Sequence, residues 1–316
     1  MQNRTLLGVV YLCLGVLVFS LQDAIIKSVS GSYALTEVVT IRCVVSVPIL
    51  LVMVQWEVGI KALLSPNYKV LINRSIIMLA AYTTYYMAFP ALKLADAVAL
   101  YFTVPLFMLA LAAPLLGERI GWRRVTAVTV GFVGVIVMMQ PGAGVFEPAA
   151  LLSLLSAATY ALSMLMARKL GNAESASVMA FYQNGIYLAG AAVLAIILGL
   201  TGIHSAAHPS LNFLVRPWGQ PSLHDFLMIA SCGVIAAVGM LFLTNAYRIA
   251  RASVVTSFEY TGLIWAPLWG YLFFGEIPGS ATYYGAALIV AGGLFSLSSP
   301  AARETVTAEV PGQEKA

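Results

Sequence analysis

Three ionisable side chains lie inside long apolar runs of this sequence, where placing a charge in lipid is costly. They are Asp23, Arg42 and Glu259, and ionisable residues inside membrane-spanning segments usually mark a substrate or ion pathway. Lys27 lies at the end of its apolar run, where a long side chain can extend to the membrane surface. We therefore take Asp23, Arg42 and Glu259 as candidates for substrate contact or gating, and leave Lys27 aside.

Asp23 and Arg42 are expected at the same depth of two neighbouring helices. Counting from the helix ends places Asp23 roughly 8 Å deep and Arg42 roughly 10 Å deep. The two side chains could form an ion pair, with Gln22 beside it. Such a pair has two interpretations: it neutralises two charges within the membrane, or it forms an outer gate that contacts a substrate carboxylate.

Glu259 is expected roughly 10 Å into a third helix, at a depth shared with Gln183 and Asn184 of another predicted helix. A carboxyl group in a low-dielectric environment favours its neutral form. Glu259 could therefore take up a coupled proton, or meet a cationic substrate, as the inner side opens. The alternative is a protonated or arginine-paired carboxyl that closes its helix against a neighbour.

Aromatic residues form a second group of candidates. From Tyr82 onward they follow the spacing i, i+3, i+4, i+7, which places them on one helix face. Tyrosines at middle depth in other helices need a partner or a wet cavity. A cavity of phenols suits flat or cationic ligands, although core packing explains the same pattern. The candidate substrate-binding or gating residues are Gln22, Asp23, Arg42, Tyr82, Tyr86, Tyr101, Tyr160, Gln183, Asn184, Tyr187, Glu259 and Tyr260.

No other pattern indicates catalysis or a cofactor. The three cysteines lie in apolar stretches without CxxC or metal-ligand spacing. His204, His208 and His224 lie in or beside the 201–222 loop, and Pro209 argues against a helix that would align the first two as ligands. A GxxxxGK[ST] nucleotide signature is missing as well. We expect no enzyme, no metal, no cofactor and no nucleic-acid partner.

The composition is that of a polytopic membrane protein. Apolar residues make up 60% and charged residues 9% of the 316-residue chain, and the mean hydropathy is +0.90, whereas a soluble domain has about 25% charged residues. A membrane-spanning helix needs roughly 20 apolar residues. The predicted spans are residues 5–28, 35–56, 73–92, 97–116, 122–140, 149–168, 176–200, 223–247, 252–274 and 280–299.

The placement of lysine and arginine predicts the orientation. With the N-terminus in the cytoplasm, most of the 17 such residues fall in inner segments, among them Arg74 at the start of its span. The positive-inside rule then places both termini on the cytoplasmic side of the inner membrane. The polar tail 301–316 is predicted to be disordered. The 201–222 loop is expected at the outer interface, anchored by Trp218, and its deletion is expected to leave folding intact because no span is altered.

The two halves of the chain, 1–143 and 144–300, resemble each other. Leu94-Ala95-Asp96-Ala97 and Ile249-Ala250-Arg251-Ala252 open equivalent helices, and each of these helices ends in Gly-Glu. Each half has five predicted spans, an odd number, so the halves must insert with opposite orientation. The prediction is an all-α integral membrane protein with ten transmembrane helices in two inverted five-helix repeats. Inverted repeats are typical of transporters whose site lies at the repeat interface.

The five-plus-five plan, the Ala-x-Ala start, Pro105, Gly117-Glu118-Arg119 and the glycine-rich closing helices resemble the drug/metabolite transporter superfamily, and within it the EamA group. The resemblance covers about residues 5–300. It implies that helices 1–4 and 6–9 enclose the route while helices 5 and 10 pack outside it. Tyr260 stands where the family pattern would align a proline.

The function that these features favour is secondary transport by alternating access. The expected substrate is a small polar or amphiphilic metabolite, with an amino acid or related nitrogenous compound favoured by the phenols. One alternative is broad-range efflux of drugs or toxic metabolites, and a second is a membrane scaffold that transports nothing. The expected partners are the substrate and the lipid bilayer, with a proton as the candidate coupling ion, for a monomer or homodimer.

Overall fold

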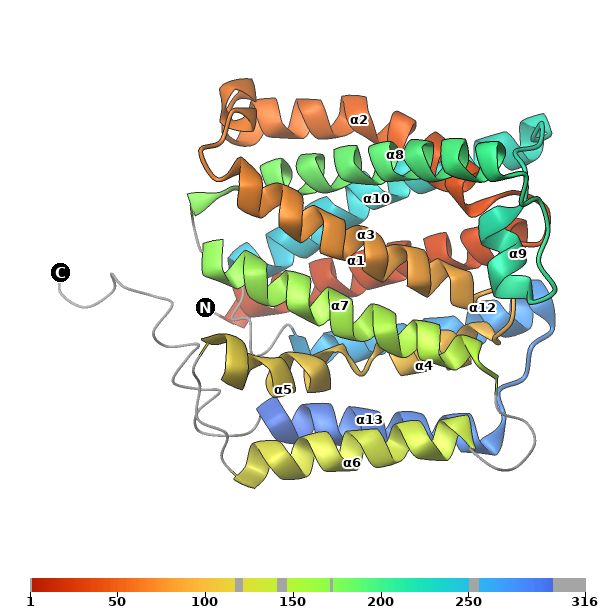
Figure 1. Ribbon diagram of the computed structural model, residues 1–316. Coiled ribbons are helices and arrows are strands. Elements are labelled where there is room, and N and C mark those ends of the chain that lie inside the picture. The colour runs from red at the N-terminus through yellow and green to blue at the C-terminus, as the bar shows by residue number, and fades with distance from the viewer. Residues whose placement is uncertain (1, 117–121, 141–146, 171–172, 250–255, 298–316) are drawn as a thin grey trace, which may run out of the picture.

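The protein is a bundle of lengthwise helices (Figure 1) in a computed structural model that describes residues 2–116, 122–140, 147–170, 173–249 and 256–297. The described chain contains no strand, which agrees with the predicted all-α class. The elements are α1 (Gln2–Val29), α2 (Leu35–Glu57), η1 (Ile60–Leu63), α3 (Tyr68–Ala88), α4 (Leu94–Tyr101), α5 (Val104–Leu116), α6 (Trp122–Met139), α7 (Ala149–Leu170), α8 (Ala176–Thr201), α9 (Pro209–Val215), α10 (Leu223–Ile249), η3 (Thr256–Thr261), α12 (Gly262–Phe274) and α13 (Ser280–Leu297).

Five helices of the described chain, α1, α2, α7, α8 and α10, contain apolar segments long enough to cross a membrane. Three shorter apolar stretches lie at Leu94–Met108, Val125–Met139 and Ser280–Phe295. Most predicted spans coincide with a single helix. Two do not, and both exceptions bear on the site.

The predicted span 97–116 is interrupted. It forms α4 and α5, which are separated by Phe102 and Thr103. Pro105 follows at the start of α5; a proline ring clashes with the carbonyl four residues earlier, here that of Tyr101, and removes one helical hydrogen bond. Thr103 is fully buried and its hydroxyl donates to the Leu100 carbonyl at 2.7 Å. The prediction of one continuous helix was therefore wrong.

The described part of the predicted span 252–274 changes its type of helix. It begins as the 3₁₀ turn η3 and continues without a gap as α12 from Gly262. Short 3₁₀ turns are frequent at the ends of α-helices. The break between α4 and α5 and the junction of η3 with α12 fall in corresponding predicted spans of the two halves of the sequence.

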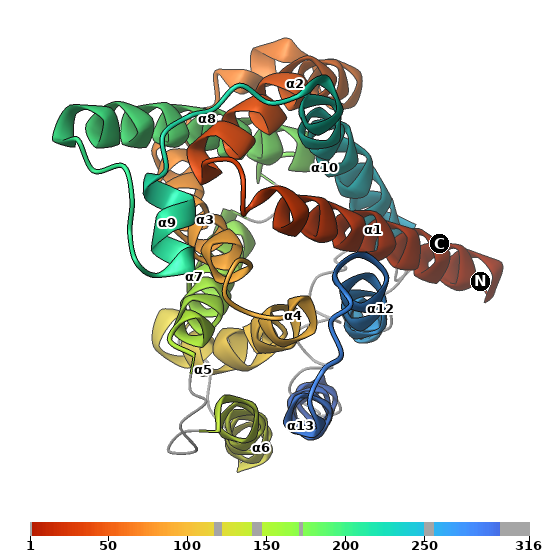
Figure 2. The same ribbon diagram turned by 90° about the vertical axis from the view of Figure 1, so that its right-hand side faces the viewer.

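Helix pairs join the first half of the chain to the second. α1 packs against α10, α2 against α8, α3 against α7, α4 against α12, and α6 against α13. Figure 2 shows α6 and α13 together at one edge of the bundle, away from α2 and α8. This is the position that the resemblance implied for the fifth and tenth helices.

Glycines bring α6 and α13 close together. A Cβ at Gly134 would lie 2.6 Å from the Gly285 carbonyl oxygen, and one at Gly292 would lie 2.6 Å from the Ala127 carbonyl oxygen. Any larger residue at these positions would push the two backbones apart. These glycines therefore serve a contact within the chain.

The bundle has an end at which α9 lies and an opposite end. The α9 end carries the α1–α2, α3–α4 and α12–α13 connections, and the opposite end carries η1 and the α7–α8 connection (Figure 1). At the opposite end Glu174 accepts hydrogen bonds from Ser65 and, at 2.9 Å, from the Asn67 amide. The Tyr182 hydroxyl donates to the Leu63 carbonyl at 2.7 Å. These bonds join the two halves there.

The 201–222 segment folds onto the helices. Phe213 of α9 is fully buried in the main apolar core. Trp218 Nε1 donates to Thr36 Oγ1 at 2.8 Å, and the Gly219 N–H donates to Glu37 Oε2 at 3.1 Å. Apolar and hydrogen-bonding groups of this segment therefore find partners on α2 and α3, which argues against the expectation that its deletion leaves folding intact.

Several sequence features lie outside the described residues. They are the Gly117-Glu118-Arg119 motif, the boundary between the repeats at 143/144, residues 250–252 of the second Ala-x-Ala motif and the tail 301–316.

Candidate functional site

A small cavity lies where α3, α4 and α7 meet. Its volume is about 10 Å³, on the order of the space that one water molecule needs and far below the roughly 300–1,000 Å³ of typical ligand pockets. The lining residues are Ala81, Tyr82 and Tyr85 of α3, Tyr101 of α4, and Ser156 and Tyr160 of α7. The structure is therefore closed tightly around a polar, aromatic point inside the bundle.

Six tyrosines pack around this cavity and are called the tyrosine cluster below. The ring of Tyr82 is central: its centroid lies 5.8 Å from that of Tyr86 and 5.4 Å from that of Tyr187. Tyr160 lies 6.4 Å from Tyr82 and 5.5 Å from Tyr101. The members are Tyr82, Tyr85 and Tyr86 of α3, Tyr101 of α4, Tyr160 of α7 and Tyr187 of α8. Five of them were predicted as site residues, and they converge from four helices.

Asp23 and Arg42 contact two neighbouring tyrosines rather than each other. The Tyr85 hydroxyl donates to Asp23 Oδ2 at 2.9 Å. Arg42 Nη1 donates to the Tyr86 hydroxyl oxygen at 3.4 Å, and Gln22 Nε2 donates to the same oxygen at 2.9 Å. The expected ion pair is not formed, since Asp23 and Arg42, both described, share no N–O contact within 4 Å. Phenols of α3 separate the two charges.

Arg42 is also stacked on an aromatic ring. Its guanidinium carbon lies 5.6 Å from the ring centroid of Tyr187, and the residue is buried. Gln183 Nε2 donates to the Tyr187 hydroxyl at 3.3 Å, and Asn184 Nδ2 donates to the Cys43 carbonyl at 3.1 Å. Of the two predicted amides of α8, Gln183 thus contacts the tyrosine on which Arg42 is stacked, and Asn184 contacts the backbone of the residue after Arg42.

The break between α4 and α5 meets the 3₁₀ turn η3 through aromatic residues. Phe102, at the break between α4 and α5, has its ring centroid 5.6 Å from that of Tyr260 in η3. A Cβ at Gly262 would lie 2.8 Å from Phe102 Cζ, so this ring packs directly on the start of α12. Glu259 precedes Tyr260, is half-buried and lies within electrostatic range of Tyr160. The break between α4 and α5, the turn η3 and the tyrosine cluster therefore form one continuous region.

Arg74 is a buried cation that the sequence analysis placed at the membrane edge. Because α3 begins at Tyr68, Arg74 lies in the second turn of the helix. Only 5% of its surface is exposed. The boundary was misplaced because the residues before 73 combine polar and apolar types, a mixture that hides an amphipathic helix start.

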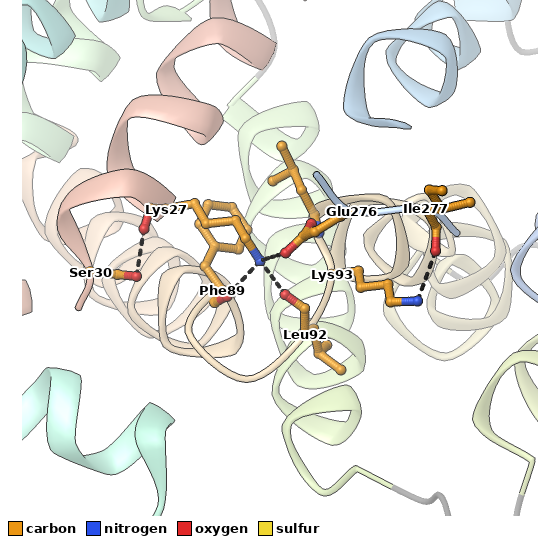
Figure 3. A network of polar contacts seen from close by, with 8 residues as sticks. Lys27, Ser30, Phe89, Leu92, Lys93, Glu276 and Ile277 are labelled. Atoms are coloured by element: carbon orange, nitrogen blue, oxygen red, sulfur yellow. Dashed lines mark hydrogen bonds and ion pairs between the residues drawn. The ribbon is translucent and has the colours of Figure 1, made fainter. Parts of the chain in front are cut away.

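Lys27 closes the α9 end of the bundle (Figure 3). Its Nζ lies 2.8 Å from Glu276 Oε1, donates to the Phe89 carbonyl at 3.0 Å and also donates to the Leu92 carbonyl. The side chain is only 9% exposed. Leaving Lys27 aside as a lysine that extends to the membrane surface was therefore wrong: it joins α1 to the α3–α4 and α12–α13 connections.

Glu276 holds the start of α4 as well. Its Oε2 accepts the Leu94 N–H at 2.8 Å, a favourable place for a carboxylate because helix N-termini carry partial positive charge. Gly275 ends α12 with φ +64°, a left-handed conformation that suits glycine. Beside it, Lys93 Nζ donates to the Ile277 carbonyl at 2.8 Å (Figure 3). The Gly-Glu motif therefore turns the chain and fixes the carboxylate.

Comparison of the sequence with known protein families gives a match to a family of transporters. The description "EamA-like transporter family" matches residues 6–140 and 147–298, which cover both halves of the chain. A solved crystal structure shares the fold with a TM-score of 0.60 at 18% sequence identity, covering 96% of this chain and 99% of that one.

Curated relatives carry the names of small-molecule transporters. An S-adenosylmethionine uptake transporter of Rickettsia prowazekii is 26% identical over 92% of this chain and 92% of its own length. The pseudopaline exporter CntI of Pseudomonas aeruginosa is 27% identical over 90% of this chain and 93% of its own. A riboflavin transporter of Rhizobium johnstonii is 33% identical over 68% of this chain and 65% of its own.

Proposed function

Because this chain belongs to the EamA-like transporter family, we propose that it is a secondary transporter that carries a small nitrogenous metabolite through the tyrosine cluster by alternating access. The relatives are named for the transport of small molecules, and the chain is accordingly a multi-pass membrane transporter rather than an enzyme. We propose which residues form the substrate site, which class of substrate they bind and by which mechanism the substrate crosses the membrane.

The observation that carries the proposal is the contact, beside the cluster, between the break of α4–α5 and the 3₁₀ turn that leads into α12. Transporters built from repeats place their substrate at discontinuous helices in corresponding positions of the two halves. Here Phe102, at the break between α4 and α5, lies ring to ring with Tyr260 of the 3₁₀ turn η3, and Tyr101, one residue before the break, lines the cavity. A substrate at this point would contact both halves at once.

The chemistry of the cluster favours a flat or cationic nitrogenous ligand. Phenol faces attract cations and stack on planar rings, and Asp23 supplies a carboxylate at the edge of the cluster through Tyr85. S-adenosylmethionine and riboflavin, for which two relatives are named, are both nitrogenous compounds with flat ring systems. An amino acid or a related metabolite fits the same groups.

The proposed membrane topology has ten spans in two inverted repeats, with both termini in the cytoplasm of an inner-membrane protein. The helix pairs support this topology. A two-fold axis that relates the two inverted repeats would map the pair α1–α10 onto the pair α7–α3. The same axis would map each of the pairs α2–α8, α4–α12 and α6–α13 onto itself. The positive-inside rule then turns the α9 end outward. The Lys27–Glu276 pair becomes the outer closure that must separate when the route opens to the outside.

Glu259 is the proposed site of proton coupling. Its position next to the break and near Tyr160 lets a change of protonation reach the cluster directly. A carboxyl that alternates between neutral and charged forms changes the polarity of the route as it opens inward. The proposed driving force is thus a proton gradient.

The proposal is tested by measuring first the binding of candidate ligands and then the transport of the ligand that binds. A thermal-shift screen of the purified protein against amino acids, S-adenosylmethionine, riboflavin, nucleosides and quaternary amines identifies a ligand. Counterflow into proteoliposomes loaded with that ligand then measures saturable exchange. Stabilisation by a narrow chemical class with saturable exchange supports the proposal. Exchange of many unrelated drugs would favour broad-range efflux, and stabilisation without any exchange would contradict transport of that ligand.

A further inference from the structure

Arg74 is a buried cation without a hydrogen bond to its side chain. Its Nε and Nη1 atoms are buried and have no partner in the structure. The nearest polar link is to its backbone, whose carbonyl accepts from Ser163 Oγ at 3.4 Å. A buried charge that is neither paired nor hydrogen-bonded opposes folding. A residue kept under these conditions calls for a role beyond stabilising this conformation.

Arg42 provides the internal comparison. It is buried to a similar degree, yet it donates to the Tyr86 hydroxyl and stacks on the Tyr187 ring. Its environment therefore compensates part of the cost of burial. Arg74 has no equivalent contacts, although Tyr82, Tyr160 and Tyr187 are within electrostatic range of its charge.

The two arginines approach the tyrosine cluster from different ends of the bundle. Arg42 reaches Tyr86, which lies one turn from Tyr82 toward the α9 end. Arg74 lies about two turns from Tyr82 on the other side, toward the opposite end. The cluster therefore lies between two guanidinium groups along α3.

A polar face of α7 runs along the same interval. Ser156, Tyr160 and Ser163 follow the spacing i, i+4, i+7, so they share one side of α7, the helix packed against α3. Ser156 lines the cavity, and its buried hydroxyl has no hydrogen-bond partner in the structure. Ser163 contacts the backbone of Arg74. Hydroxyl groups thus line the interval between the cavity and Arg74.

We propose that Arg74 is a second carboxylate-binding residue of the route, which receives the carboxylate of the substrate after Arg42 has released it. The inference rests on the proposed transport function and narrows its substrate class to nitrogenous metabolites that carry a carboxylate. Guanidinium groups bind carboxylates through two parallel hydrogen bonds, and the free donors of Arg74 supply that geometry. The tyrosines hold the flat or cationic part of the same molecule.

The experiment uses matched pairs of ligands that differ only in the carboxylate. The pairs are S-adenosylmethionine with decarboxylated S-adenosylmethionine, L-tryptophan with tryptamine, and L-tyrosine with tyramine. Affinities are measured for the full chain in detergent, for the wild type, Arg74→Gln and Arg74→Lys. Lys69→Gln is the control, because it removes an exposed cation from the same helix.

The wild type and Lys69→Gln should prefer the carboxylate member of at least one pair by roughly tenfold or more, the scale of a charge-assisted hydrogen bond. Arg74→Gln should lose most of that preference, and Arg74→Lys, which keeps the charge, should retain part of it. A merely structural arginine would lower the affinity for both members equally and leave the preference intact. If Arg74→Gln does not fold, the same comparison is made with Arg74→Lys alone.

Failure of the inference differs from failure of the proposed function. Binding without carboxylate preference, or a preference that survives Arg74→Gln, overturns the inference and leaves nitrogenous transport standing. Inorganic phosphate is tested in parallel. Stabilisation by phosphate alone, dependent on Arg74, would assign the residue to a phosphate such as a lipid headgroup and would also overturn it. Absence of binding by every pair contradicts the inference together with the proposed substrate class.

Discussion

Lys27 of α1 and Glu276 of the α12–α13 connection form an ion pair of 2.8 Å that joins the first half of the chain to the second. The pair is mostly shielded from solvent, and each partner makes a further backbone contact: Lys27 with the α3–α4 connection and Glu276 with Leu94. Such an ion pair stabilises the closed conformation. It also acts as a gate, because the two residues must separate when the α9 end opens.

The ion pair should be coupled energetically. Neutralising one partner leaves the other charge buried and unpaired. The losses in unfolding free energy of Lys27→Gln and Glu276→Gln should therefore add up to more than the loss of the double variant. We expect a coupling free energy of about 0.5–3 kcal/mol from a double-mutant cycle of unfolding in detergent. Lys61→Gln, which removes an exposed lysine of η1 at the opposite end of the bundle, is the control. Additive effects of the two substitutions would show that the pair does not hold this end closed.

Glu259→Gln should preserve folding and lower transport. The amide keeps the size and hydrogen-bonding capacity of the carboxyl but cannot exchange a proton. We therefore expect a lower rate and a flatter dependence of the rate on pH in proteoliposomes. Glu57→Gln, an exposed carboxylate at the end of α2, should change neither quantity. An unchanged rate and pH profile in Glu259→Gln would remove Glu259 from the coupling mechanism.

Exchanging the charges of Asp23 and Arg42 should not restore function. Asp23 accepts from Tyr85 and Arg42 donates to Tyr86, so each single change disrupts a different phenol. Asp23→Arg with Arg42→Asp should remain as inactive as the worse single variant, with no recovery of melting temperature. The measurement is counterflow and thermal melting of both single variants and the double variant. Recovery in the double variant would mean that the two charges pair directly in another state.

Phe213→Ala should destabilise the protein strongly. The side chain is fully buried where α9 packs on α2 and α3, and Phe→Ala changes in such places cost about 3–5 kcal/mol. Leu211→Ala on the exposed side of α9 is the matched control and should have a small effect. The melting temperatures in detergent compare the two. Equal melting temperatures would restore the view of the 201–222 segment as a dispensable loop.

The sequence pattern predicted that the tyrosines of α3 share one face, because helical spacing fixes which side chains lie together. Tyr82, Tyr85 and Tyr86 had to point the same way, and a mid-membrane phenol had to find polar or aromatic company. Depth alone did not predict the Asp23–Arg42 geometry. Equal depth leaves the rotation of each helix undetermined, and α3 places its phenols between the two charges.

Other features depend on contacts that no local pattern encodes. Lys27 looked like an ordinary helix-end lysine because its partner, Glu276, lies near the other end of the sequence. The break after Tyr101 was visible only as Pro105, and prolines also occur in transmembrane helices without ending them. Arg74 was misplaced because an amphipathic first turn gives no clear boundary. In each case tertiary packing, rather than composition, decides the outcome.

The most direct test of the account is counterflow through the tyrosine cluster. Tyr82→Leu keeps an apolar side chain of moderate size but removes the central phenol ring, whereas Tyr284→Leu makes the same change at a residue of α13 that is 69% exposed. Thermal melting checks that both variants are folded. We predict that Tyr82→Leu lowers the efficiency of saturable exchange at least roughly tenfold, equivalent to about 1.4 kcal/mol, while Tyr284→Leu matches the wild type. Equal exchange by all three folded proteins would contradict the claim that the substrate passes through this cluster.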